Sequence, residues 1–485
     1  MKSRSLAVVI GAVLVVSSFA CLAWWLTRDT APTRVLAAFT IVAPTSVSES
    51  QVVARALVPV ADGCPEVVVS GQDGASRIPM SSRLPGPNAA PAFSDVLACS
   101  ASLPVGLTSA SINGKVIPAS MPSSVNRIGI FADSGCRLDD YQIQACNDVN
   151  KWPLAQIAGR IADAKPDLVI NPGDYIYREI ACPDDKQTEC GGTIGPKAGL
   201  PFSETDLGWV QEFFDPAAAI FPVAPIAFLR GNHEDCGRAG NGWFLYLDPF
   251  PGTETTCDPV VGKDGLEAAA PQTTPAWAFD AAVGPDRTLR IAMVDSAYGS
   301  DRELTSWVDQ QRVIYQQAEA LTKPEPGVES WLVTHRPLFS LISTTLLPKD
   351  DPLVDPWTSD GQMIASYGLL ENYDMVLASH IHFAQVTQIP GQPAAVIIGN
   401  GGALLEPTTG YGIPKFGPLA KADGTPLVAG LAPYPNASFL WTNVQYGYAI
   451  AESGSSTGQW TIDNYDYDGS MSASCPLANR TITCE

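Results

Sequence analysis

The chain has 485 residues, of which 46% are hydrophobic and 16% are charged, and Gly and Pro each occur 41 times. This composition is typical of a loop-rich globular protein and excludes a coiled coil or a disordered chain. Nucleic-acid-binding proteins carry a basic surface, whereas this chain has a net charge of −21, so we expect no nucleic-acid partner.

The N-terminal segment 1–27 has the pattern of a membrane anchor. Two basic residues precede an apolar run from Leu6 to Leu26. At about 20 residues this run can span a bilayer, whereas a cleavable signal peptide has an apolar core of about 7–15 residues. We predict an uncleaved anchor, which would be the only membrane attachment. Cleavage after Ser18-Phe19-Ala20 and acylation of Cys21 stay open as alternatives, and all three place the remainder outside the cytoplasm, in the periplasm or at the cell surface.

Cysteine usage agrees with export. One cysteine lies in the apolar run, and ten lie beyond it. An even number in an exported chain predicts five disulfide bonds, although some free buried thiols are the alternative. The sequence has no C-x-x-C pair, so we do not expect a zinc site with cysteine thiolate ligands. The sequence alone does not fix the connectivity, and we take pairing between nearest neighbours as the prediction: Cys64–Cys99, Cys136–Cys146, Cys182–Cys190, Cys236–Cys257 and Cys475–Cys484.

Residues 35–122 are predicted to form a small all-β domain. Short apolar runs such as 52–54 and 66–69 are separated by Gly, Pro and Ser. Asn113-Gly114 between apolar residues predicts a hairpin. This region has no histidine and no catalytic cluster, so we expect it to serve in packing or presentation.

The remainder, 126–485, alternates between strand-like and helix-like patterns, which predicts an α/β fold. Helices are predicted over 154–162, around Phe213-Phe214 and from Leu304, and the tail from Asn443 is β-like. Regions 252–275 and 405–437, which are rich in Pro, Gly and Asp, are predicted surface loops. Predicted strands cover residues 128–131, 168–170, 226–229, 290–294, 331–333, 375–377 and 395–398.

The four histidines of the chain all follow strand-like runs. Asp133, Asp174 and Asn232 occupy equivalent positions, and Asp174 lies on an Asn-Pro-Gly turn. Open α/β sheets place their chemistry at the carboxyl ends of strands, whereas structural histidines would fall anywhere. The pattern therefore predicts a metal centre in which Asp174 bridges two ions. The histidines are His233, His335, His380 and His382.

Five segments in order resemble the signature blocks of calcineurin-like metallophosphoesterases, and most closely the purple acid phosphatase pattern. The resemblance covers roughly 126–402 and implies a four-layer sandwich of two mixed β-sheets flanked by helices. The segments are Asp133-Ser134-Gly135, Gly173-Asp174-Tyr175-Ile176-Tyr177, Gly231-Asn232-His233-Glu234, Thr334-His335 and His380-Ile381-His382.

Two positions depart from the superfamily pattern. Gly135 stands where most members have a ligating histidine, and Tyr177 is positioned to replace it, unless it only packs beneath the site. Ser379 stands where the last block normally has glycine, which is a mild change. A phenolate is a hard oxygen donor, so Tyr177 favours Fe(III).

The resemblance implies two ion sites that share Asp174. We expect Fe(III) with a divalent ion (Zn, Mn or Fe), with a Mn/Zn pair as the alternative. Two ions lower the pKa of a bound water, and the resulting hydroxide attacks phosphorus in line. The implied ligands are Asp133, Asp174, Tyr177 and His382 for the first ion, and Asp174, Asn232, His335 and His380 for the second.

His233, beside Asn232, is implied to protonate the leaving oxygen. Glu234 or Asp235 is a candidate to orient His233, with an exposed loop acid as the alternative. Arg336 is a candidate phosphate contact, with a structural role as the alternative.

The sequence therefore predicts an exported metal-dependent hydrolase of phosphate esters, and a phosphomonoesterase resembling acid phosphatases in particular. A phosphodiesterase acting on nucleotides or phospholipid headgroups is the first alternative. A non-catalytic surface protein on a decayed scaffold is the second, although every ligand position is filled. The sequence gives no indication of the oligomeric state.

Overall fold

The computed structural model describes residues 34–72, 74–86, 89–200, 202–250, 257, 273–298, 308–340, 364, 367–406 and 438–485. The predicted anchor, most of the two predicted loops and the predicted helix start at Leu304 lie outside these residues. Across the described ranges, no helix is both long and apolar enough to cross a membrane.

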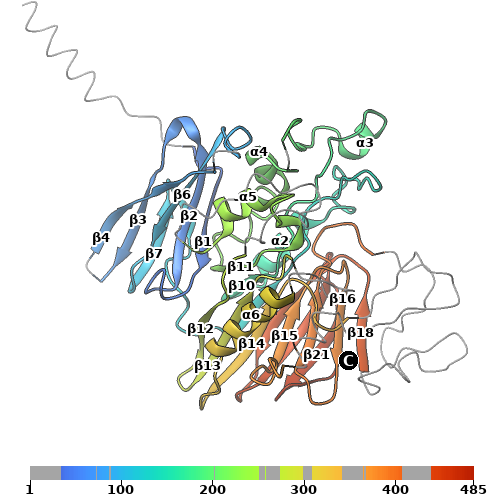
Figure 1. The fold of residues 1–485 in the computed structure, drawn as a ribbon. Coiled ribbons are helices and arrows are strands. Elements are labelled where there is room, and N and C mark those ends of the chain that lie inside the picture. Colours follow the sequence, from blue (N-terminus) through green and yellow to red (C-terminus); the bar gives the residue numbers. More distant parts are fainter. Residues whose placement is uncertain are drawn as a thin grey trace, which may run out of the picture.

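Two large β-sheets lie face to face at the centre of the protein (Figure 1). Side chains of both sheets, among them Ile170 and Trp331, share one buried core. Helix α2 (Leu154–Asp163) packs on the outer face of one sheet, and α6 (Val308–Leu321) packs on the outer face of the other. These are the four layers that the resemblance implies.

The first sheet has eleven strands and contains elements from the beginning, middle and end of the chain. In spatial order they are β22 (Thr481–Ile482), β21 (Met471–Ala478), β20 (Gln459–Asp466), β19 (Gly447–Ser453), β9 (Arg127–Ile130), β10 (Leu168–Asn171), β11 (Ile226–Phe228), β1 (Ala37–Val42), β2 (Val52–Pro59), β6 (Val96–Ser102) and β5 (Ser81–Arg83). Strands β9, β10, β11 and β1 are parallel, and β19 adds antiparallel to β9. All four residues of β10 are buried, as expected for a parallel strand covered on both faces.

The second sheet has seven strands. In spatial order they are β12 (Trp277–Gly284), β13 (Arg287–Val294), β14 (Val328–Thr334), β15 (Met375–Ala378), β17 (Ala394–Ile398), β16 (Ala384–Gln388) and β18 (Ser438–Asn443). Its middle strands β13, β14, β15 and β17 are parallel. Their carboxyl ends therefore lie at one edge of the sheet.

The N-terminal strands are divided between two sheets. Strands β1, β2, β5 and β6 extend the first sheet, and the others form a separate four-stranded sheet that packs on it through a core of small and branched side chains. That sheet has the order β4 (Gly74–Pro79), β3 (Glu66–Gly71), β7 (Leu107–Ile112) and β8 (Lys115–Ile117). The region is strand-rich as predicted, and the domain division at 122–126 stays a prediction.

Local sequence signals account for several elements. Helix α2 buries Leu154, Ile157, Ala158 and Ile161, the helical spacing seen in the sequence, and Lys165 before Pro166 follows its end with φ of 50°. Asn113 and Gly114 have φ of 46° and 81°, as the predicted hairpin turn requires. The remaining helices are η1 (Val60–Asp62), η2 (Asp184–Lys186), α3 (Gln187–Cys190), α4 (Asp206–Trp209), η3 (Val210–Phe214), η4 (Asn232–Glu234), α5 (Gly240–Gly242) and η5 (Trp243–Leu247).

All five disulfide bonds of the nearest-neighbour prediction are present. Cys64–Cys99 lies in the N-terminal strands, and Cys475–Cys484 lies in the C-terminal strands. The other three are Cys136–Cys146, Cys182–Cys190 and Cys236–Cys257, and each closes a loop near one of the predicted signature blocks.

Two buried arginines connect the N-terminal strands to η5 and to the residues that follow it directly. Arg55 on β2 is fully buried and donates to the carbonyl oxygens of Leu245, Tyr246 and Asp248 at 3.0, 3.1 and 3.2 Å. Arg83 on β5 donates to Leu245 O at 3.0 Å and to two further carbonyls of this segment. The N-terminal region is thus packed against the part of the chain that follows the Asn232 block.

We expect Arg55→Met to destabilise the protein by about 2–6 kcal/mol. The carbonyls of Tyr246 and Asp248 lose their donor in a buried place, and each unsatisfied buried polar group costs about 1–3 kcal/mol. Urea unfolding of the purified protein measures the difference. Arg77→Met is the matched control, because Arg77 is exposed and pairs only with exposed Glu66, so its effect should stay within about 0.5 kcal/mol. An equal effect of both variants would contradict the anchoring role of Arg55.

Candidate metal centre

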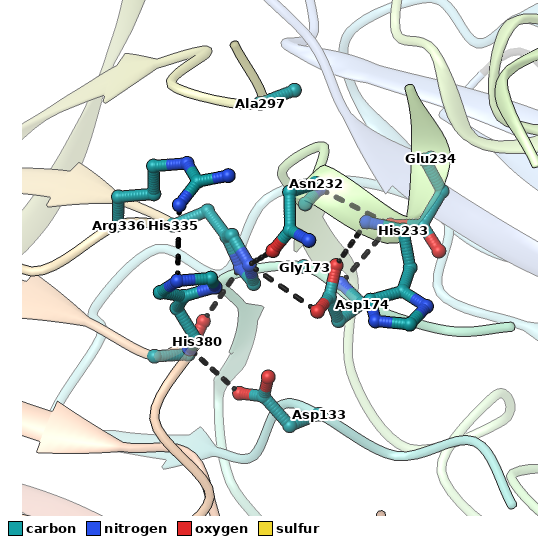
Figure 2. Close-up of polar contacts among 12 residues, drawn as sticks. Asp133, Gly173, Asp174, Asn232, His233, Glu234, Ala297, His335, Arg336 and His380 are labelled. Atoms are coloured by element: carbon teal, nitrogen blue, oxygen red, sulfur yellow. Dashed lines mark hydrogen bonds and ion pairs between the residues drawn. The ribbon is translucent and has the colours of Figure 1, made fainter. Parts of the chain in front are cut away.

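The carboxyl ends of five strands converge on one cluster of polar side chains (Figure 2). Because these ends lie at facing edges of the two sheets, residues far apart in the sequence come together. β9 leads to Asp133, β10 to Asp174, β11 to Asn232, β14 to His335, and β15 to His380 and His382.

The turn that carries Asp174 depends on glycine. Gly173 has φ of 116°, and a Cβ there would lie 2.6 Å from Gly231 N and 2.8 Å from His335 Nδ1. Asp174 itself has φ of 62°, and Asp133 and His380 also lie in the left-handed region at 52° and 72°. Three non-glycine residues in this conformation within one cluster mark a site where backbone strain is retained for function.

Glu234 holds the Asp174 turn in place. Its Oε2 accepts from Asp174 N at 3.0 Å and Gly231 N at 3.1 Å, and its Oε1 accepts from Tyr175 N at 2.8 Å and Ile176 N at 3.3 Å. Burial and the nearby charge of Asp174 raise the pKa of Glu234 well above its usual range. Four amide donors nevertheless favour the carboxylate form, which accepts at both oxygens.

One group of donors surrounds the hydroxyl of Tyr177. This oxygen lies 2.9 Å from Asp133 Oδ1, 2.7 Å from Asp174 Oδ2 and 3.0 Å from His382 Nε2. His382 Nδ1 lies 2.7 Å from Leu404 O, a pure acceptor, so Nδ1 carries the proton and Nε2 faces the cluster with its lone pair. Burial lowers the pKa of His382 to about 3, so its ring is neutral.

Gly135 is sterically required beside Tyr177. A Cβ at this position would lie 2.5 Å from Glu212 Oε1, 2.6 Å from Tyr175 O and 2.8 Å from Tyr177 Cδ2. Glu212 in turn accepts from Tyr177 N at 2.7 Å and Cys136 N at 2.9 Å. The position where most superfamily members have a ligating histidine therefore has no space for a side chain, because the Glu212 carboxylate, the Tyr175 carbonyl and the Tyr177 ring fill it.

A second group of donors shares Asp174. His335 Nε2 lies 3.0 Å from Asn232 Oδ1 and 3.3 Å from Asp174 Oδ2. The ring of His380 lies 5.1 Å from the ring of His335, and donor atoms of Asp174, His335 and His380 all lie within 4.8 Å of one another. Asp133, Asp174 and His382 satisfy the same criterion, so Asp174 belongs to both groups.

The donor set fits two cations. Burial and the neighbouring Asp174 raise the pKa of Asp133 well above its usual range, whereas nearby imidazoles outweigh burial and lower the pKa of Asp174. Burial and both aspartates raise the pKa of Tyr177. At the first group, two carboxyl groups and an imidazole thus face one phenolic hydroxyl. Positive ions between these acceptors relieve the repulsion and favour ionisation of Tyr177.

His233 lies beside these groups rather than between them. Its backbone N donates to Asp174 Oδ1 at 2.8 Å, and its buried ring lies over the Tyr177 ring with centroids 3.9 Å apart. Its Nδ1 is 3.4 Å from Glu179 Oε1, and Arg238 Nε is 3.6 Å from the same oxygen. Burial lowers the pKa of the His233 imidazole well below its usual range.

The three predicted supporting residues, Glu234, Asp235 and Arg336, all have contacts within the protein. Glu234 is a buried acid occupied by the Asp174 turn, and Asp235 Oδ1 accepts from Gly237 N at 2.7 Å. Arg336 donates to His380 Nε2 at 3.0 Å (Figure 2), and its backbone N donates to Ser296 Oγ at 2.9 Å. Glu179, rather than Glu234 or Asp235, is the carboxylate that faces the His233 ring.

Three charged residues near the site were not predicted from the sequence. They are Glu179, Arg238 and Arg137, whose guanidinium carbon lies 5.2 Å from the Tyr177 ring centroid. Arg137 follows Cys136 directly, and Arg238 lies two residues after Cys236. Their positions next to disulfide cysteines and signature blocks were the sequence signal that could have placed these charged residues near the site.

Comparisons with known proteins agree with this geometry. The model of the calcineurin-like phosphoesterase family matches residues 127–384. A purple acid phosphatase, PPD1 from yellow lupin (Lupinus luteus) seeds, is 15% identical with a TM-score of 0.52, over 90% of this chain and 73% of that one. PhoD is 12% identical with a TM-score of 0.53, over 93% and 91%. No curated protein sequence matches. At these identities the solved structures show a shared fold.

Proposed function

Because the chain belongs to the calcineurin-like phosphoesterase family, we propose that it is an exported phosphomonoesterase with a two-ion centre. Membership of the family and the donor set support a metal-dependent hydrolase of phosphoric esters. The observation that carries the proposal is the pair of acceptor groups that share Asp174, with Tyr177 in the first group. The choice of a monoester follows from the resemblance of this Tyr-containing pattern to purple acid phosphatases.

The ligand residues have defined roles in this proposal. Asp133, Asp174, Tyr177 and His382 hold one ion, and Asp174, Asn232, His335 and His380 hold the other. The ions would activate a water molecule for attack and offset the charge of the phosphoryl oxygens. The protein fixes the ligands through the strand ends and through Glu234, so that their positions are set before substrate binds.

His233 is the proposed general acid. Its Nδ1 faces Glu179. The proposed role needs a second proton on Nε2, which an anionic phosphate ester bound beside the ring would favour, and Nε2 is the atom from which the leaving ester oxygen would take that proton. Stacking on Tyr177 restricts rotation of the imidazole. Arg238 holds Glu179 from the other side.

For the ions, we propose Fe(III) at the Tyr177 group and Zn, Mn or Fe(II) at the Asn232 group, with a Mn/Zn pair as the alternative. Tyr177 supports this choice because phenolate oxygen is a hard donor. Asn232, His335 and His380 supply an amide oxygen and two imidazoles, a set suited to a divalent ion.

We expect Tyr177→Phe to remove the visible absorption band that a tyrosinate gives with Fe(III). The phenyl ring keeps the packing against His233 but supplies no oxygen. Tyr175→Phe is the matched control, because the Tyr175 hydroxyl donates to Leu229 O at 2.8 Å and contacts no predicted ligand, so this variant should keep the band. A purified wild-type protein that is colourless and contains only zinc or manganese would show that the Fe(III) assignment is wrong.

Metal analysis combined with two model substrates tests the function. We expect two ions per chain and a kcat/KM for p-nitrophenyl phosphate that exceeds that for bis(p-nitrophenyl) phosphate. A preference for the diester would instead favour a phosphodiesterase acting on nucleotides or phospholipid headgroups. Binding of fewer than two ions would contradict the proposed centre.

Export is proposed from two features. Five disulfide bonds are expected in an oxidising compartment, and the predicted anchor at 1–27 would hold the protein at the outer side of a membrane. Cell fractionation with a thiol-labelling assay tests this: a membrane-associated protein without free thiols beyond residue 27 is expected. A fully reduced cytosolic protein would contradict it.

A further inference from the structure

Ser379 is a departure from the superfamily pattern that the proposed function leaves unexplained. The backbone at this turn does not require glycine, because the residue in the left-handed region is His380, and Ser379 is not among the residues with positive φ. The side chain of Ser379 is fully buried. A hydroxyl in such a place needs partners, and the partners it has belong to the candidate metal centre.

The Ser379 hydroxyl forms a closed triangle with His335 and Pro172. Ser379 Oγ lies 2.9 Å from His335 Nδ1 and 3.2 Å from Pro172 O, and His335 Nδ1 lies 3.0 Å from the same carbonyl oxygen. The backbone adds a fourth contact, because Ser379 N donates to His335 O at 2.9 Å. His335 is therefore held at both its main chain and its ring by one residue.

The triangle determines which nitrogen of His335 carries the proton. A carbonyl oxygen only accepts, so the proton lies on Nδ1, between Pro172 O and Ser379 Oγ. The Ser379 hydroxyl then accepts from Nδ1 and donates its own proton to Pro172 O, so the three members of the triangle are satisfied. Nε2 keeps its lone pair and faces Asn232 Oδ1 and Asp174 Oδ2 at 3.0 and 3.3 Å.

We propose that Ser379 is a positioning residue that strengthens binding of the ion held by Asp174, Asn232, His335 and His380. With glycine at position 379, His335 Nδ1 would lose its contact with the hydroxyl and keep its contact with Pro172 O. The added hydroxyl restricts ring rotation and makes Nε2 a better donor, as partners of ligating histidines generally do. This inference rests on the proposed two-ion centre and extends it to a residue that contacts no ion.

The test compares zinc binding by wild-type protein, Ser379→Ala and Ser379→Gly. Metal-free protein is titrated with zinc alone in competition with a chromophoric chelator, which resolves the two binding steps without an activity assay. We expect one step to weaken about tenfold in both variants, the lower end of the effect known for partners of ligating residues. The other step should stay within about twofold. Ser48→Ala is the control, because it removes a buried hydroxyl bonded to Leu103 O and should change neither step.

Three other outcomes overturn the inference and can be distinguished. Unchanged zinc affinities in both variants would show that the hydroxyl does not support the ligand. Equal weakening of both steps with a lowered urea midpoint would assign Ser379 a role in folding only. Failure of the wild-type protein to bind any zinc would reject the proposed divalent site, and with it the proposed function itself. Ser379→Gly guards against misfolding, because it restores the residue of the superfamily pattern.

Discussion

Replacing Asp174 with asparagine is expected to release both metal ions and to lower kcat/KM about 10³- to 10⁴-fold. Asp174 is the residue shared by the two donor groups, and the amide has the same shape but no charge. Two bound ions supply several kcal/mol of transition-state stabilisation, and each 1.36 kcal/mol corresponds to a factor of ten in rate. Metal content and steady-state kinetics are measured on the same preparation.

The His233→Ala variant distinguishes the loss of the proposed general acid from the loss of a metal ion. This variant should retain two ions per chain while turnover falls about 10²- to 10⁴-fold, the range for general acid catalysis. If His233→Ala loses an ion, the imidazole is a ligand and the assignment of His233 is wrong. If Asp174→Asn keeps both ions and near wild-type activity, the bridging role of Asp174 is wrong.

Glu234→Gln is expected to lower the free energy of unfolding by about 2–6 kcal/mol and to impair metal retention. Each carboxylate oxygen accepts from two backbone amides, and glutamine replaces one oxygen with an NH₂ group that faces two donors. Two buried amides then lack acceptors, at about 1–3 kcal/mol each. Urea unfolding of the metal-free protein measures the stability, so that loss of ions does not contribute.

The exposed control for this substitution is Glu66→Gln, which should change stability by less than about 0.5 kcal/mol. A tolerated Glu234→Gln would contradict the role of the Glu234 carboxylate in holding the Asp174 turn.

The strands that lead to the candidate site were predictable because strand ends are local signals. Apolar runs followed by Asp133, Asp174 and His335 are visible without knowledge of the fold. The sequence left the cysteine connectivity open, and the structure has the nearest-neighbour pairs. The role of Tyr177 was an implication of the resemblance to the purple acid phosphatase pattern, and the structure shows that the neighbours of Gly135 leave no space for a histidine side chain there.

The contacts that were not predicted depend on side-chain direction or on pairing across the chain. Glu234 follows His233 directly in the short helix η4, yet their side chains have different partners. The His233 ring contacts the Tyr177 ring, whereas the Glu234 carboxylate accepts from the Asp174 turn. Glu179 reaches His233 from a different block. The parallel pairing of β1 with β11 joins residues such as Ile41 and Ile226, a separation that no local pattern reveals.

The pairing of β19 with β9 has a consequence for the order of events during synthesis. β9 carries the first ligand block, and its free edge is covered by Gly447–Ser453, about 300 residues further along the chain. At roughly 5–20 residues per second, the ribosome delivers that partner about 15–60 s after Asp133. Until then the strand that leads to Asp133 has one unpaired edge. A chain that ends before Gly447 would therefore contain every proposed ligand but would leave one edge of β9, the strand that leads to Asp133, without its partner.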